Sequence, residues 1–472
     1  MCSKILILVA LSTSQSHSGV YNVPSWEPTW KMNLSTIIMP CNNKGYITDP
    51  VIRRFGIVDL DWTNTKDLWK VANPMTAEEN LVKQAELIKQ ETSEAKVWVY
   101  RNTVLAMPWF TAVRKIMEDE AYRPWFLKFK PGVDGRGALH HDGDGTYYHP
   151  VCDHGFSPPK CTDLFHSMEY AMGDDRAVRC GPLAEQCGPT SRPSETQTTC
   201  TSCDCGELPC GMYLFDHRSK AVINNQTLAE WFVDNLILSP TGLLNPNIDG
   251  FFIDDTWSQA GASDLNGSEV LDIGLSSQDL SDLTDSWIAN MNFVKAAILR
   301  HKGFIWQQMV NNDTCAGPVV PKEPEACAAT LRKACTSDSP EQTGALFYGL
   351  SSQANCSFIG GQGDPSLPDP AWKEDLASFL LIRGPYAWLG YAWAGCGHAY
   401  WRPDEDLNQD YGIPSSGLCK ETESGSRVFV REFTQASVLM DCNKYKGTVK
   451  MKLTGSRASR QLGEEDYSLT HR

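Results

Sequence analysis

Several short apolar runs in this sequence end in aspartate, a residue that can donate or accept a proton. The run Gly250-Phe-Phe-Ile-Asp-Asp255 ends in Asp254 and Asp255, and Met212-Tyr-Leu-Phe-Asp216 ends in Asp216. If these runs are adjacent parallel strands, their carboxylates lie close together. A glycosidase needs such a pair, one group to protonate the leaving oxygen and another to attack or to activate water. We therefore predict that Asp216 is the nucleophile or base and that Asp254 or Asp255 is the general acid.

The two consecutive aspartates are expected to differ in role. Side chains alternate along a strand, so only one of Asp254 and Asp255 should point into the mouth of the fold, while the other caps the next helix. An earlier run ends similarly, with Asp59 and Asp61. For any single aspartate here the alternative is a structural role, because carboxylates also cap helices, pair with Lys or Arg and hold loops.

Aromatic and charged residues close to the same run ends could bind a sugar. Indole and phenol rings stack on sugar rings, so we predict that Trp62, Tyr100 and Trp257 bind substrate together with Asp61. Arg101 closes the third apolar run, and we expect it to hold a carboxylate or a substrate hydroxyl.

A histidine cluster raises the question of a metal. Five of the ten histidines lie near Asp142, Asp144 and Asp153, namely His140, His141, His149, His154 and His166. Their spacing matches no standard ligand pattern, and the neighbouring cysteines are better explained as disulfides than as zinc ligands. We expect no metal and no cofactor. The Gly-x-Ser-x-Gly of esterases and the phosphate-binding Gly-x-x-x-x-Gly-Lys-Ser/Thr do not occur, so those chemistries lack their central residue.

The elements that must position these residues are short strands alternating with helices. Eight apolar runs fit strands: Thr36–Met39, Gly56–Trp62, Lys96–Arg101, Met212–Asp216, Gly250–Asp255, Gly303–Gln308, Leu346–Leu350 and Tyr386–Trp393. Helical signals lie between them: a capping box starts at Thr76, and a helix begins around Ser276 with Trp287, Met291, Val294 and Ile298 on one face. Alternation of this kind predicts an α/β fold with parallel strands, either a barrel or an open sheet. The Gly-x-Gly-x-x-Gly of an open dinucleotide-binding sheet is missing after the first run, so we predict a (β/α)8 TIM-like barrel.

We place the barrel at residues 20–400, interrupted by two insertions and followed by a C-terminal segment and a tail. Residues 131–210 are rich in Cys, His, Gly and Pro and are predicted to be one long loop insertion over the barrel mouth, stapled by its eight cysteines. A shorter cysteine-bearing insertion is expected at about Asn311–Thr336. Residues 401–453 are predicted to be a C-terminal β segment, and 454–472 a disordered tail.

Several features favour export. Lys4 precedes the apolar run Ile5–Leu11, which gives way to small polar residues, so residues 1–19 are predicted to be a cleaved signal peptide. Seventeen cysteines less Cys2 of the leader leave an even sixteen, which fits full disulfide pairing. Five glycosylation sequons fit the same route: Asn33, Asn225, Asn266, Asn312 and Asn355. We expect a secreted, extracellular or cell-surface glycoprotein.

The charge limits the partners. A net charge of −15 leaves no basic face for phosphates, so we expect no nucleic acid partner, and no run outside the leader suggests a membrane span. The expected partner is a carbohydrate substrate, and the oligomeric state stays open.

Short blocks of the sequence also resemble a family. Met212-Tyr-Leu-Phe-Asp-His217 and Asp249-Gly-Phe-Phe-Ile-Asp-Asp255 look like the fourth and fifth strands of glycoside-hydrolase-like TIM barrels from uncharacterised secreted algal and bacterial proteins. The segments Asp410–Pro414 and Arg427–Met440 resemble their C-terminal strand pair. The resemblance implies a sugar substrate and carboxylates at Asp216 and at Asp254 or Asp255.

Two other classes of protein remain open. One is a non-catalytic carbohydrate-binding or structural cell-surface protein that keeps the barrel. The other is a disulfide-rich metal hydrolase, which would need three ligands converging from the region His140–His166.

Overall fold

The computed structural model describes residues 23–40, 42, 44–50, 52–69, 72, 75–107, 109–128, 140–141, 147–150, 211–258, 261–262, 265–266, 275–306, 320–349, 371–394 and 402–452. The predicted signal peptide and disordered tail lie outside these residues and stay predictions.

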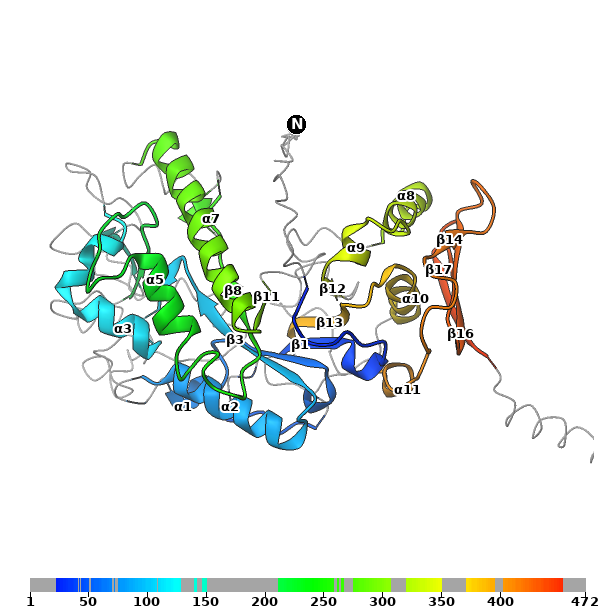
Figure 1. Cartoon of the computed structure of the whole chain (residues 1–472), viewed down its shortest axis with the longest axis horizontal. Helices are drawn as coiled ribbons and strands as arrows, with labels where there is room; N and C mark the ends of the chain where they lie inside the picture. The colour runs from blue at the N-terminus through cyan, green and yellow to red at the C-terminus, as the bar shows by residue number, and fades with distance from the viewer. Residues whose placement is uncertain are drawn as a thin grey trace, which may run out of the picture.

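A seven-stranded sheet forms the centre of the molecule (Figure 1). Its strands are β1 (Thr36–Pro40), β2 (Ile57–Leu60), β3 (Lys96–Asn102), β8 (Gly250–Asp254), β11 (Phe304–Trp306), β12 (Leu346–Gly349) and β13 (Ala387–Ala394). They lie in the order β11-β8-β3-β2-β1-β13-β12, and every neighbouring pair is parallel. The predicted parallel α/β architecture is therefore confirmed.

The sheet is curled, so its two edge strands approach each other. Trp306 on β11 and Phe347 on β12 have ring centroids 5.7 Å apart, although five strands separate β11 from β12 in the sheet. Trp98 on β3 also reaches Phe347, at 5.6 Å. Such contacts are possible only across a concave face, which these aromatic rings fill as side chains fill a barrel.

The N-terminal segment contacts strands near both edges of the curled sheet. Trp26 packs edge-on against Phe304 of β11 at 6.0 Å and against Trp388 of β13 at 6.4 Å. The backbone carbonyl of Trp26 also accepts a hydrogen bond from Tyr386. This segment therefore links strands from the two halves of the curled sheet.

The strand predicted at Met212–Asp216 is not part of this sheet, so the prediction of eight barrel strands is wrong for that run. It is β7 (Gly211–Leu214), in an antiparallel sheet of order β4-β7-β6-β5 with β4 (Leu105–Ala106), β5 (His140–His141) and β6 (Tyr147–Pro150). A four-residue apolar run carries no sign of which sheet it joins. The predicted loop insertion 131–210 thus contains two short strands, while its eight cysteines lie outside the described residues.

Helices and short turns connect the strands. The α-helices are α1 (Lys66–Trp69), α2 (Ala77–Glu91), α3 (Thr111–Glu118), α5 (Leu228–Phe232), α7 (Ser277–Arg300), α8 (Pro324–Ala334), α9 (Pro340–Thr343), α10 (Trp372–Ile382) and α11 (Asp404–Leu407). The 3-10 turns are η1 (Met32–Leu34), η2 (Ile52–Arg54) and η3 (Glu120–Trp125); η5 (Val233–Ile237) is a π-turn; and β9 (Gly261–Ala262) pairs with β10 (Leu265–Asn266).

The two predicted helix starts have different outcomes. α7 begins as expected, because Ser276 and Asp279 form a reciprocal capping box and the predicted apolar face is buried. α2 also begins where predicted, but Thr76 makes no capping bond. In the first turn of α2, the Glu78 carboxylate accepts a hydrogen bond from the backbone N–H of Ala112.

A four-stranded antiparallel sheet lies at the C-terminal end, drawn in orange and red beside α10 in Figure 1. It comprises β14 (Lys420–Glu421), β15 (Val428–Glu432), β16 (Ala436–Asp441) and β17 (Lys446–Met451). Disulfides Cys327–Cys442 and Cys335–Cys419 tie α8 to this part of the chain. The insertion predicted at about Asn311–Thr336 is therefore partly a helix. These disulfides fit the predicted oxidising route.

Among the described residues, no helix has the length and apolar character needed to cross a bilayer.

Candidate active site

Acidic side chains gather where β2, β3 and β8 end. The register places Asp59 beside Trp98, and Asn102 beside Asp254. Since side chains two residues apart share a face, Asp61 and Asp254 lie on the concave side with Trp98. Carboxyl ends of parallel strands are where barrel enzymes carry their reactive groups.

Tyr100 and Asn102 of β3 hold the two consecutive aspartates. The hydroxyl of Tyr100 donates to Asp254 Oδ2 at 2.8 Å. The amide nitrogen of Asn102 donates to Asp255 Oδ2 at 2.5 Å and to the Tyr100 hydroxyl at 3.0 Å. The amide oxygen of Asn102 accepts from the backbone of Val104 and Leu105 at 2.8 and 2.7 Å. The turn after β3 therefore fixes the amide that orients both carboxylates.

The prediction that Asp254 and Asp255 point to opposite sides is wrong. Asp255 has φ 59°, in the left-handed region, which turns its side chain back toward Asn102. The next long helix, α7, is capped by Ser276 instead. Period-two alternation holds only inside an extended strand, and the chain leaves that conformation at Asp255.

Electrostatics favour a protonated Asp254. Burial raises the pKa of the Asp254 carboxyl well above its ordinary value, and the charges of Asp255 and Asp61 raise it further, while the Tyr100 hydrogen bond lowers it. The pKa of Tyr100 is also raised, first by burial and then by both aspartates. Asp254 is nevertheless partly accessible, so a proton held there can reach a ligand.

Asp61 and Asp59 occupy contrasting environments on β2. Asp61 Oδ1 accepts hydrogen bonds from the Thr63 backbone at 2.9 Å and from the Thr63 hydroxyl at 2.6 Å, and Asp61 is 1% exposed. Asp59 is fully buried, and neither of its carboxyl oxygens has a hydrogen-bond partner among the described residues. Burial raises the pKa of Asp59 well above its ordinary value, and the charges of Asp61 and Asp254 add to the effect. Both effects favour the protonated form of Asp59.

Asp59 is at the end of an apolar run in the sequence, but we predicted no catalytic or binding role for it. The available signal was its place two residues before Asp61, which puts both side chains on the concave face.

Asp216 is not next to Asp254, so the predicted adjacency of these strand ends is wrong. β7 neighbours β4 and β6, whereas β8 neighbours β3 and β11. Asp216 accepts two side-chain hydrogen bonds from Arg218, at 2.9 and 2.8 Å, and Arg218 also pairs with Asp279 at 3.2 Å. The ion pair occupies both oxygens of the Asp216 carboxylate.

The predicted sugar-stacking residues are buried. Trp62 and Trp257 are each 2% exposed, and Trp62 packs against Trp109 at 5.0 Å. Tyr100 lies between the rings of Phe110 at 6.1 Å and Phe252 at 5.7 Å. None of the three presents an open ring face, so their predicted stacking role is not supported. Tyr100 belongs to the site through its hydroxyl.

Arg101 faces away from the site. Its guanidinium donates to the carbonyls of Tyr100, Leu236 and Thr241 and lies 4.0 Å from Glu78. The carboxylate that Arg101 approaches is that of Glu78, on the helix-covered side of the sheet, and its predicted role in binding substrate stays a prediction. Odd and even residues of β3 thus serve the two faces.

The acidic side chains do not form a metal centre. Within the part of the chain that the structure describes, no group of three or more His, Cys, Asp or Glu side chains is arranged to hold a metal ion.

No protein-family model matches this sequence. No curated protein matches it either. Solved structures with a similar chain path include sucrose 6F-phosphate phosphorylase from Thermoanaerobacter thermosaccharolyticum, 9% identical with a TM-score of 0.39 over 89% of this chain and 95% of that one. A debranching enzyme of Nostoc punctiforme is 9% identical with a TM-score of 0.40, over 90% and 91%. Cyclic alpha-maltosyl-(1→6)-maltose hydrolase from Arthrobacter globiformis is 10% identical with a TM-score of 0.37, over 90% and 98%.

Proposed function

We propose that the protein hydrolyses glycosidic bonds of an oligo- or polysaccharide, with Asp254 as general acid and Asp61 as general base. The observation that carries this proposal is the hydrogen-bonded set Asp254–Tyr100–Asn102–Asp255 at the strand ends, opposite an Asp61 held by Thr63. It supplies one carboxyl, Asp254, whose surroundings favour the protonated form, and in this proposal Asp61 is the anion. Glycoside hydrolysis needs that difference between two carboxyls.

The spacing of the strands favours inversion. Asp61 and Asp254 end strands on either side of β3, and adjacent strands are about 4.8 Å apart. Two strand spacings, shortened because the face is concave, give the expected distance between the two carboxyls. This distance fits the separation of about 6.5–9.5 Å in inverting enzymes better than the roughly 5–5.5 Å in retaining ones. In this scheme Asp61 activates a water held between the two carboxyls.

Asp255 has a supporting part in this proposal. Its charge raises the pKa of Asp254, and Asn102 fixes its position. Asp255 thereby keeps the acid protonated when the substrate arrives. Asp216, ion-paired with Arg218, has no catalytic role in this scheme.

The first test is reducing-sugar release from a panel of algal and bacterial polysaccharides, with Asp254→Asn and Asp61→Asn beside the parent protein. We expect each substitution to reduce release by about 10²–10⁴-fold with the fold intact. Asp254→Asn should recover on an aryl glycoside with a dinitrophenolate leaving group, which needs no acid, whereas Asp61→Asn should not. NMR of the first product should show the inverted anomer.

Two results would count against this assignment. If both variants recovered equally on the activated substrate, the assignment of Asp254 as acid and Asp61 as base would be wrong. Absence of release alongside retained polysaccharide binding would support a non-catalytic carbohydrate-binding protein.

A further inference from the structure

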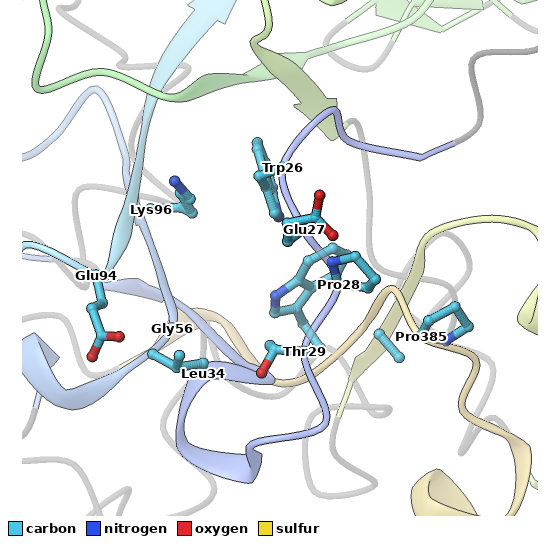
Figure 2. A pocket seen from close by; sticks show the side chains of 11 residues that line it. Trp26, Glu27, Pro28, Thr29, Leu34, Gly56, Glu94, Lys96 and Pro385 are labelled. Carbon is cyan, nitrogen blue, oxygen red and sulfur yellow. The ribbon is translucent and has the colours of Figure 1, made fainter. Parts of the chain in front are cut away.

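A cavity lies at the opposite ends of the central strands from the carboxylates. Its volume is about 240 Å³, and its lining includes Lys96 at the start of β3 and Ala387 at the start of β13 (Figure 2). Asp254, by contrast, is the last residue of β8. A ligand in this cavity would therefore bind apart from the candidate active site.

The cavity combines aromatic walls with charged groups. The indoles of Trp26 and Trp388 meet edge to face, with centroids 6.4 Å apart. Figure 2 shows Lys96 and Glu94 on one side of the cavity and Trp26 and Glu27 on the other. The ammonium of Lys96 is 5.2 Å from the Trp26 ring centroid and 3.4 Å from Asp249.

The two glutamates have no partner within the described residues. Glu27 and Glu94 are both exposed, and neither makes a hydrogen bond or ion pair there. Their carboxylate oxygens can accept hydrogen bonds from the hydroxyls of a ligand whose C–H face rests on the half-buried Trp26 ring, whereas Trp388 is 4% exposed and stacks on Phe347. The Lys96 ammonium adds a donor for a ligand oxygen.

We propose that this cavity binds one pyranose ring of a carbohydrate, independently of the carboxylate site. A pyranose has the apolar face and the ring of hydroxyls that this lining complements. The volume lies below the range of about 300–1,000 Å³ typical of drug-sized ligands, which fits a single ring.

Two sources could supply that ring. One is a free saccharide. The other is a glycan on Asn33, because Asn33-Leu34-Ser35 is a glycosylation sequon, Asn33 is exposed and Leu34 lines the cavity. The recognised chemistry is the same in both cases.

The test uses Asn33→Gln protein from a secreting eukaryotic host, so that no glycan is attached at this position. Binding of methyl β-glucoside, methyl α-mannoside, methyl β-galactoside and N-acetylglucosamine is followed by saturation-transfer NMR and by titration. We expect at least one probe to bind, and the added pair Glu27→Gln and Glu94→Gln to weaken it at least ~10-fold. Glu405→Gln, another exposed glutamate without a described partner, is the matched control and should change nothing.

Adding Asp254→Asn should leave this binding unchanged, so the two sites can fail separately. Probes that bind the parent as well as Asn33→Gln protein identify a free saccharide as the ligand. Probes that bind only after loss of the glycan identify the Asn33 glycan as the natural occupant. Failure of every probe to bind Asn33→Gln protein, or undiminished binding to the glutamate double variant, overturns the proposal.

Discussion

Asn102 donates to Asp255 over 2.5 Å while its amide oxygen accepts the backbone hydrogens of Val104 and Leu105. One side chain therefore sets both the path of the chain after β3 and the orientation of a site carboxylate. Asn102 is itself 4% exposed, so water cannot replace these bonds.

Asn102→Ala should destabilise the protein. It leaves two buried backbone N–H groups without their acceptor and removes one donor from the Asp255 carboxylate; each unsatisfied N–H group costs about 1–3 kcal/mol. We expect the free energy of unfolding in urea to fall by roughly 2–6 kcal/mol. Asn235→Ala, which removes only a donor to the Trp231 carbonyl, is the comparison and should cost much less. Equal losses in the two variants would contradict the role given to Asn102.

Tyr100→Phe should shift the pH dependence of hydrolysis. The Tyr100 hydroxyl stabilises the Asp254 carboxylate, so its removal raises the pKa of Asp254 further. A general acid must be protonated, and the alkaline limb of kcat/KM should therefore move to higher pH. The measurement is the pH profile of kcat/KM, with Tyr122→Phe as a control remote from the site. A limb that stays in place or moves to lower pH would exclude Asp254 as the acid.

Asp59→Asn should stabilise the protein at neutral pH. The unfolded carboxyl ionises near pH 4, whereas the folded one keeps its proton to a much higher pH. Over the window between these two pKa values, stability of the parent falls as pH rises, by up to about 1.4 kcal/mol per pH unit. Asparagine has no proton to lose and removes that slope.

The measurement for Asp59 is urea unfolding from pH 4 to pH 8. Asp338→Asn, an exposed aspartate, is the control and should keep the parental slope. A parental slope in Asp59→Asn protein would show that Asp59 is not the buried neutral acid.

Asp216→Asn should leave hydrolysis within about twofold of the parent, since in our scheme its carboxylate only pairs with Arg218. Loss of this partly buried pair should cost about 1 kcal/mol of stability. Reducing-sugar release and urea unfolding measure the two effects. A loss of activity comparable with that of Asp254→Asn would restore Asp216 to the catalytic pair.

The sequence was informative about the strands and less so about their partners. Runs such as Ile57–Leu60 and Gly250–Asp254 are mostly apolar, with one aspartate each, and are buried along almost their whole length, which is typical of a strand inside a parallel sheet. Both lie in the central sheet. The run at Gly211–Leu214 has the same local character but pairs with β4, which follows β3, and with β6 from the long insertion. Sheet membership depends on contacts distant in sequence, which a short apolar pattern does not encode.

The candidate site shows the same limit at the level of single residues. Asp254 was predicted because it ends an apolar run, whereas Tyr100 was predicted for its ring but contacts Asp254 through its hydroxyl. The turn of Asp255 toward Asn102 depends on a left-handed backbone conformation, which an aspartate adopts only when its surroundings hold it there. Arg101 shows that a charged residue at a strand end can serve the helix-covered face instead.

The two disulfides constrain how this molecule can be assembled and cut. Both half-cystines near α8, Cys327 and Cys335, find their partners 115 and 84 residues later in the chain. During synthesis the Cys335 bond therefore cannot close until Cys419 has been added to the chain, and the Cys327 bond cannot close until Cys442 has been added. Once the bonds have closed, a protease that cleaves anywhere between Cys335 and Cys419 opens the backbone without releasing a fragment, so the two parts would separate only after reduction.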